Sequence, residues 1–442
     1  MYHSLNSLGC ARMLRGSVMT ILSLAILWCP WVKHSQAQSG QDVSQYVQKA
    51  RAAYQQKDYS TLIENLKLAL ALRPNHASYT YNIAVGYALS GNQTEAYNWL
   101  NRLADMGLVY NVSGDKDFAS IKDTSEFKSL VQKFETNKKP VGNSTTAFTV
   151  HEKGFVPEGI AYDPVEKTFY LGSVYKRKIL SIDQAGAVKD FSAPADGLWS
   201  VMGMRVDAAR RVLWVCTASH PQMMDFNKAE TGRSGIFKYD LRTKRLVKKY
   251  MIASTAKPHW LGDLVLNSRG DVFASDSVTP AIYVLDQRTD RLELFLENSA
   301  FVNPQGLAFS ADEKRIFLAD YLKGIFAIDV RSRTVSLIKP APHTTMLGFD
   351  GLYSYRGTLV GVQNGVRPNR LVQLWLNSTA TEVQKFEIRE ANNPAFDEPT
   401  LAVIAEHDLF YIANSQWETV DEQGHLAPAE KLHDPIVLKL RL

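Results

Sequence analysis

Six short stretches of the 442-residue sequence share one pattern, in which an apolar run follows a tight corner, and their spacing constrains the fold more than any other feature. Successive corners lie 43 to 60 residues apart. This is the repeat length of four-stranded propeller blades and is too long for a leucine-rich repeat. The corner residues are, in chain order, Glu158, Met202, Gly262 with Asp263, Gln305, Asp350 and Pro399.

Each corner is followed by two further β-rich runs and by a weaker fourth run, which is typical of an outer edge strand. The sequence therefore predicts a six-bladed, all-β propeller over residues 146–442. The sixth blade lacks a fourth run because the chain ends at Leu442. We expect residues 147–150 to supply this strand, which would close the ring. The corner glycines Gly159, Gly306 and Gly351 are expected to adopt positive φ.

Residues 41–137 differ from the rest of the sequence, because apolar residues recur there at helical spacing. Runs over 46–56, 59–72, 79–89 and 94–106 predict two helical hairpins. With small residues such as Ala50 and Ala84 beside Tyr54 and Trp99, this segment resembles tetratricopeptide repeats, which implies a surface for a protein partner. A helical cap docked on the propeller is the alternative. Residues 138–145 have the composition of a linker.

The N-terminal residues 1–37 have the features of a cleaved signal peptide. Arg12 and Arg15 precede an apolar run over 18–32, which ends before the small residues Ser35 and Ala37. We expect export to the periplasm or the medium, and an uncleaved anchor is the alternative. Without this segment 47 basic residues face 45 acidic ones, which gives no indication of nucleic-acid binding. No later segment is apolar enough to span a membrane. Cys216 is then the one remaining cysteine, so no internal disulfide is predicted.

The corner residues converge on one end of the central channel, because the innermost strand of each blade begins there. We call this end the mouth. Carboxylates from Glu158, Asp350 and Asp263 would repel one another across it unless a cation lay between them. Carboxylate and amide oxygens are the ligands that calcium prefers. A corner aspartate that only caps its own turn is the competing interpretation.

The corners also carry a family resemblance. Pro157-Glu158-Gly159-Ile160-Ala161, Asn303-Pro304-Gln305-Gly306-Leu307 and Phe349-Asp350-Gly351-Leu352 are similar to the corresponding blades of the gluconolactonase and senescence-marker family, whose wider set includes paraoxonases and strictosidine-synthase-like proteins. The resemblance implies a divalent cation, usually calcium, that activates water for lactone or ester hydrolysis. It implies that Glu158 and Asp350 are ligands and that Asp350 is the catalytic base.

Two corners depart from the family pattern. Gln305 and Gly262 stand where the family has asparagine, so Asp263 could reach inward as a replacement ligand or could face away. His259 and Trp260 precede the third corner and could border a substrate pocket. The residues that end the second runs could line the same pocket or could shape turns; they are Asp276, Asp320, Asn364 and Asn414.

The sequence lacks the motifs of serine hydrolases, zinc proteases and nucleotide-binding enzymes. Two interpretations remain open. In the first, the protein is an exported calcium-dependent hydrolase of a small lactone or ester. In the second, the propeller binds a ligand or a protein without turnover, and the helices recruit a partner.

Overall fold

The structure is a computed structural model that describes residues 40–253 and 257–442. The signal peptide predicted for residues 1–37 lies outside the described residues. Residues Gly40–Leu442 form one compact unit. None of the helices in this part of the chain has the length and apolar character needed to cross a membrane.

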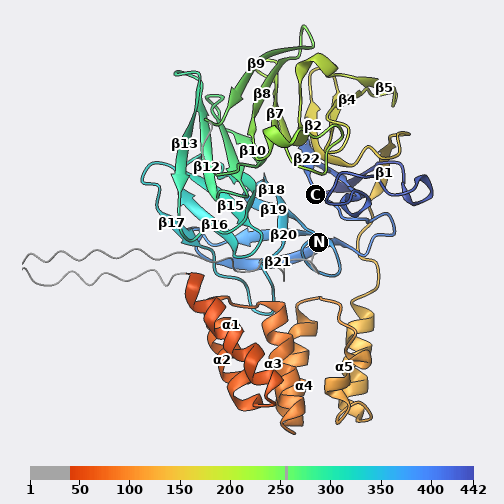
Figure 1. Ribbon diagram of the computed structural model, residues 1–442, viewed down its shortest axis with the longest axis vertical. Helices are drawn as coiled ribbons and strands as arrows, with labels where there is room; N and C mark the ends of the chain where they lie inside the picture. Colours follow the sequence, from red (N-terminus) through yellow and green to blue (C-terminus); the bar gives the residue numbers. More distant parts are fainter. Residues whose placement is uncertain (1–39, 254–256) are drawn as a thin grey trace, which may run out of the picture. The chain divides into compact units, whose positions relative to one another are not determined.

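The N-terminal part of this unit is helical (Figure 1). Two helical hairpins occupy the predicted ranges, and Asp58 and Asn92 cap the second helix of each by accepting from backbone N–H groups. A further helix follows after two short 3₁₀ turns. The elements are α1 (Gly40–Gln55), α2 (Tyr59–Leu72), α3 (Ala77–Leu89), α4 (Gln93–Asp105), η1 (Val112–Gly114), η2 (Lys116–Phe118) and α5 (Ser125–Thr136).

The strands of the described residues form six four-stranded antiparallel sheets, which confirms the predicted six-bladed propeller (Figure 1). Blade 1 contains β2 (Pro157–Asp163), β3 (Thr168–Ser173), β4 (Ile179–Ile182) and β5 (Val188–Asp190). Blade 2 contains β6 (Ser200–Asp207), β7 (Val212–Ala218), β8 (Ser234–Asp240) and β9 (Arg245–Met251). Blade 3 contains β10 (Leu261–Leu266), β11 (Val272–Asp276), β12 (Ala281–Asp286) and β13 (Arg291–Glu297).

The second half of the ring repeats this order. Blade 4 contains β14 (Pro304–Phe309), β15 (Arg315–Asp320), β16 (Gly324–Asp329) and β17 (Val335–Leu337). Blade 5 contains β18 (Phe349–Tyr355), β19 (Thr358–Gln363), β20 (Arg370–Leu376) and β21 (Val383–Ala391). Blade 6 contains β22 (Ala402–Ala405), β23 (Asp408–Ile412), β24 (Ile436–Arg441) and, as its outer strand, β1 (Thr145–Thr149).

The ring closes in two ways. The inner strands contact one another in the order β2, β6, β10, β14, β18, β22 and back to β2. At the outside, β1 pairs antiparallel with the C-terminal strand β24, and Thr145 lies opposite Lys439. The two ends of the propeller sequence therefore share one sheet, so blade 6 cannot form without both of them.

Three corners carry glycine for a reason other than the positive φ that was predicted. Gly159, Gly306 and Gly351 do not adopt positive φ. Instead, a Cβ atom on Gly159 would lie 2.0 Å from the carbonyl oxygen of Met202, and one on Gly306 would lie 2.4 Å from the backbone nitrogen of Leu352. Neighbouring inner strands therefore approach too closely at these two corners for any side chain.

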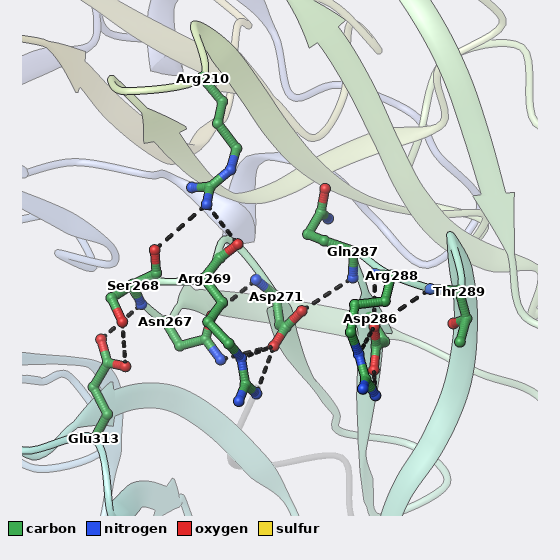
Figure 2. Close-up of polar contacts among 10 residues, drawn as sticks. All are labelled: Arg210, Asn267, Ser268, Arg269, Asp271, Asp286, Gln287, Arg288, Thr289 and Glu313. Atoms are coloured by element: carbon green, nitrogen blue, oxygen red, sulfur yellow. Dashed lines mark hydrogen bonds and ion pairs between the residues drawn. The ribbon is translucent and has the colours of Figure 1, made fainter.

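Polar contacts link the blades on the face opposite the mouth. The turns that join the first and second strands of each blade meet on that face. Figure 2 shows Arg210, from the turn of blade 2, donating to the carbonyl oxygen of Arg269 in blade 3 at 2.6 Å. Ser268 in turn donates from its hydroxyl to Glu313 of blade 4 at 2.8 Å. Arg211 extends the series to blade 1, where it pairs with Asp163 at 2.5 Å. These contacts hold the rigid ring on which the mouth is built.

Candidate functional site

A β-bulge places each corner residue at the mouth. In five inner strands the register shifts just after the first or second residue, for example between Pro157 and Ile160. Such bulges bend the strand and re-aim one side chain. In these five strands the corner residue lies two positions before the residue at which regular pairing resumes: Glu158, Met202, Gly262, Gln305 and Asp350.

The sixth corner differs from the prediction. Regular pairing in blade 6 begins with Ala402 opposite Tyr411, so the equivalent position is Thr400 and not Pro399. The reason is that β22 begins later than the other inner strands, after a segment in which Glu398 adopts a positive φ of 61°. Thr400 is buried, and its hydroxyl has no hydrogen-bond partner among the described residues.

The corner residues divide the mouth into a polar and an apolar part. Gln305, Asp350, Thr400 and Glu158 come from the consecutive blades 4, 5, 6 and 1. We call these four residues the polar arc. Blades 2 and 3 contribute Met202 and Gly262, which offer no oxygen from a side chain. The chemistry of the mouth is therefore confined to the polar arc.

Glu158 is a buried carboxyl group held by the loop that follows β23. Trp417 donates from Nε1 to Glu158 Oε2 at 2.8 Å, and the hydroxyl of Ser415 donates to the same oxygen at 3.3 Å. Burial raises the pKa of Glu158 well above its usual value, and the negative charges of Asp350 and Glu398 raise it further. The three carboxyl groups are therefore close enough to oppose one another's ionisation.

Asp350 lies in the same electrostatic field. Asn364 donates from Nδ2 to Asp350 Oδ2 at 2.8 Å. Burial raises the pKa of Asp350 to about 7, and the charge of Asp263 adds to this effect. Burial also raises the pKa of Glu398 to about 7, and Asp350 contributes. Glu398 was not predicted from the sequence, because it lies outside the repeated corner pattern.

Asp263 does not share the environment of the polar arc. It is buried, and its Oδ2 accepts from Arg205 at 3.2 Å. Burial raises its pKa although Arg205 opposes this shift. Its Oδ1 has no hydrogen bond of good geometry, although the nearby N–H groups of Leu264 and Leu307 lower the pKa. The structure thus pairs this predicted ligand with a cation that the chain itself provides.

Arg205 also reaches across the channel beneath the mouth. Its guanidinium carbon lies 5.2 Å from the centre of the Tyr353 ring. Arg205 belongs to β6 in blade 2 and Tyr353 to β18 in blade 5, which stand opposite each other in a ring of six. The hydroxyl of Tyr353 accepts from the backbone nitrogen of Ala402 at 2.6 Å. Side chains from opposite blades therefore meet across the central channel.

Of the predicted pocket residues, Asn364 is the one that contacts the polar arc. The other polar candidates hold backbone atoms. Asp276 accepts from His259 Nδ1 at 2.7 Å and from the backbone of Trp260 at 3.0 Å. Asp320 accepts from the backbone nitrogens that precede the fourth corner, and Asn414 bridges the two ends of the loop after β23. These contacts match the alternative in which such residues shape turns.

Two long loops bring aromatic side chains beside Glu158. The His220 ring, from the loop after β7, stacks on Trp260 at 4.3 Å and on Trp417 at 5.8 Å between ring centres. Gln222 Nε2 donates to the carbonyl oxygen of Val420, which joins the two loops. Burial lowers the pKa of His220 to about 4, so this ring is neutral at physiological pH. Trp417 was not predicted from the sequence, because it lies in a loop outside the repeated corner pattern.

An open hollow lies elsewhere, in the helical segment. It has a volume of about 480 Å³ and is lined by Tyr54, Tyr81, Asn111, Gly114, Asp115, Lys116 and Asp117. Its polar groups already pair with one another, because Tyr54 donates to Asp117 and Tyr81 to Asp115. It gathers no group suited to catalysis.

Comparison with known proteins found likenesses at low sequence identity among solved structures. No protein-family model matches the chain, and no curated protein sequence is similar to it. Among solved structures, the chain is similar to a gluconolactonase from Xanthomonas campestris at 14% identity, with 68% of this chain and 99% of that chain covered and a TM-score of 0.43. It is similar to virginiamycin B lyase from Staphylococcus aureus at 11% identity, with 68% and 100% covered and a TM-score of 0.46. A luciferin-regenerating enzyme is similar at 13% identity, with 69% and 96% covered and a TM-score of 0.44. At these values the likeness concerns the fold alone.

The donor set of the polar arc suits a hard cation. Among the described residues, no three His, Cys, Asp or Glu side chains are grouped as a metal site. The arc instead combines two carboxyl groups with the amide of Gln305 and the hydroxyl of Thr400. Gln305 Nε2 donates to Asn303 at 2.9 Å. Gln305 Oε1 accepts no hydrogen bond from the described residues. Such a mixture of carboxylate and neutral oxygens is typical of calcium sites.

Proposed function

We propose that the polar arc binds one divalent cation, with calcium the best match to its oxygens, and that the protein hydrolyses a lactone or a related ester there. The observation that carries this proposal is the placement of Glu158 and Asp350 as buried neighbours without a positive partner. No ion pair of the described residues involves either side chain or Glu398. A cation would favour the ionised forms that these groups otherwise resist.

The hydrogen bonds of the arc support this assignment. In each acidic side chain the protein fixes one oxygen, which is Oε2 in Glu158 and Oδ2 in Asp350. The second oxygen of each accepts no hydrogen bond from the described residues. Together with Gln305 Oε1 and Thr400 Oγ1, this gives four oxygens that would hold the cation. We leave Asp263 out of this set, because its Oδ2 already accepts from Arg205.

The residues of the mouth are arranged for proton transfer during hydrolysis. A bound divalent cation would polarise a carbonyl oxygen and acidify a water molecule. Asp350 is the group that we assign as the base, because a carboxylate beside a cation-bound water is well placed to accept its proton, and Asn364 holds its Oδ2 in position. Arg205 and Tyr353, which meet across the channel, would keep the substrate at the arc.

A binding role without turnover is the second candidate. It is favoured by Met202 and Gly262, which leave two of the six corners without a polar side chain.

For either role we propose export with loss of residues 1–37, which N-terminal sequencing of the mature protein would test. Turnover of a panel of lactones and esters by wild type, lost in Asp350→Asn, separates the enzyme from the binding protein.

The first experiment measures cation binding. Calcium is titrated into the metal-free mature protein while the melting temperature is followed. A ligand specific for the folded state stabilises it by about 2.7 kcal/mol at a hundredfold excess over its Kd. We expect a saturable rise that is absent from Glu158→Gln and Asp350→Asn. Asp312→Asn is the control, because Asp312 is an exposed carboxylate on the face opposite the mouth. The absence of a rise in wild type would contradict the proposal.

A further inference from the structure

One loop of the propeller contacts the polar arc at one end and the helical segment at the other. This loop, residues 364–369, joins β19 to β20 in blade 5 on the side of the mouth. At its start Asn364 donates from Nδ2 to Asp350 and, at 3.0 Å, to the carbonyl oxygen of Pro399. The hydroxyl of Tyr321 donates to Asn364 Oδ1 at 3.0 Å, which fixes the orientation of the amide.

The far end of the loop is attached to the helices. The backbone nitrogen of Val109 donates to the carbonyl oxygen of Arg367 at 2.8 Å. Val366 packs against the apolar core formed by α3, α4 and α5. The loop therefore takes part in a core that lies outside the propeller, and its position depends on the helices as well as on its own blade.

Arg370, directly after the loop, strengthens this attachment. It is fully buried, and its Nη1 donates to the carbonyl oxygen of Met106, the residue that caps the C-terminus of α4, at 2.8 Å. Its Nε donates to Gln363 Oε1, on the residue before Asn364, at 2.6 Å. Among the described residues no carboxylate pairs with Arg370, and its Nη2 has no partner. One guanidinium thus connects the helical segment to the residue beside Asn364.

We propose that the helical segment supports the 364–369 loop beside the mouth, and that Arg370 is a positioning residue that holds this loop so that Asn364 orients Asp350. The helices then serve the site directly and are more than a module for recruiting a partner. The inference about the loop stands on these contacts alone, and its consequence for cation binding rests on the proposed function.

The direct test compares two buried or half-buried arginines of the same blade. Arg370→Met keeps the volume of the side chain and removes both hydrogen bonds. Arg389→Met is the matched control, because Arg389 also bridges two elements, at Gln373 and at the carbonyl oxygen of Arg441, but both lie in the propeller. Arg370→Lys keeps the positive charge but should not restore the position of the loop. A single ammonium group cannot reproduce the geometry with which the guanidinium donates to two acceptors. Amide hydrogen exchange of residues 364–369 is measured in the full-length mature proteins.

We expect the loop amides of Arg370→Met to exchange at least fivefold faster than in wild type, with no such change in Arg389→Met. On heating Arg370→Met, we also expect the helical signal in circular dichroism to be lost before the tryptophan fluorescence changes. In wild type the two transitions should coincide. If calcium binds, its Kd should rise about tenfold in Arg370→Met alone. Unchanged loop exchange in Arg370→Met would overturn the inference. Failure of wild type to bind calcium would overturn the proposed function and leave the exchange result decisive for the loop.

Discussion

At the scale of single residues, the mouth presents an electrostatic conflict that should be visible as pH-dependent stability. The pKa of Asp350 and of Glu398 is raised to about 7, from usual values near 4. The folded state therefore binds more protons than the unfolded state between about pH 4 and pH 7. The contribution of these two groups to the free energy of unfolding is therefore complete below about pH 4. It is lost as the pH rises towards 7.

We predict that the melting temperature of the metal-free protein declines from pH 5 to pH 7.5, and that Asp350→Asn flattens this decline. Asparagine has the same shape but cannot ionise, so it removes the contribution of Asp350 and its repulsion of Glu158 and Glu398. The check is a series of thermal melts in a chelator. Saturating calcium should reverse the trend in wild type, because the cation binds the ionised carboxylates. A decline of equal slope in both proteins would contradict the assignment of the effect to Asp350.

Gly262 offers a gain-of-function test at the same scale. A Cβ atom at this position would lie 3.4 Å from Gln305 Oε1 and 4.0 Å from Ser277 Oγ, which is ordinary contact. Gly262→Asn should therefore fold and bring a fifth side-chain oxygen to the mouth. We predict that its calcium Kd falls by about three- to tenfold, since affinity follows the number of ligands. Isothermal titration provides the measurement, and Gly262→Ala is the control that adds bulk without an oxygen.

The sequence could identify part of this site because its residues recur at equivalent corners. Glu158, Gln305 and Asp350 each follow an apolar or proline residue and precede glycine, so the repeat itself marks them. Thr400 could not be assigned, because its blade lacks the glycine and starts its inner strand late. The pairing of Asp263 with Arg205 depends on contact between two blades, and no local pattern encodes it.

At the scale of elements, the turns opposite the mouth decide whether neighbouring blades stay in register. Arg211 joins blade 2 to blade 1 by donating to Asp163, which is fully buried, and to Glu166. Removing one member of a buried pair leaves the other charge unpaired in a medium that solvates it poorly. We predict that Arg211→Met lowers the free energy of unfolding by about 3 kcal/mol, as measured by urea denaturation.

The neighbouring residue provides a control for this prediction. Arg210 occupies the same turn and also reaches the next blade (Figure 2), but its side chain is 42% exposed. Contacts of this kind contribute up to about 1 kcal/mol, so Arg210→Met should have a small effect. Equal losses for the two variants would show that burial of Asp163 is not the source of the stability.

The strands themselves were predictable, whereas the reason for their close approach was not. Alternating apolar residues place each strand without knowledge of its partners. The corner glycines show the limit of this reasoning. The sequence predicts that these corners need glycine because of positive φ, whereas the structure shows close contact with the next blade. Gly159 faces the carbonyl oxygen of Met202, 43 residues later in the chain. Such a requirement can be recognised only when the ring is assembled.

At the scale of the whole molecule, the stability of the ring depends on segments from both ends of the described chain. The outer strand β1 completes blade 6 by pairing with β24, and the helices before it cover Arg370 and Val366. These two contributions can be separated, because Val141 lies between the last helix and β1 and pairs with Ala391. A chain that begins at Val141 loses the helices alone, and one that begins at His151 also loses β1.

We predict a graded result from these two truncations. The chain from Val141 should form a closed propeller that melts several degrees below the full-length mature protein, because Arg370 loses the carbonyl oxygen of Met106 and Val366 loses its apolar contacts. The chain from His151 should fail to fold as a monomer, since β24 becomes an unpaired edge strand. Size-exclusion chromatography with far-ultraviolet circular dichroism separates these states. Equal melting temperatures for the full-length protein and the chain from Val141 would show that the helices are an independent module, and a monomeric, folded chain from His151 would show that β1 is dispensable for closure.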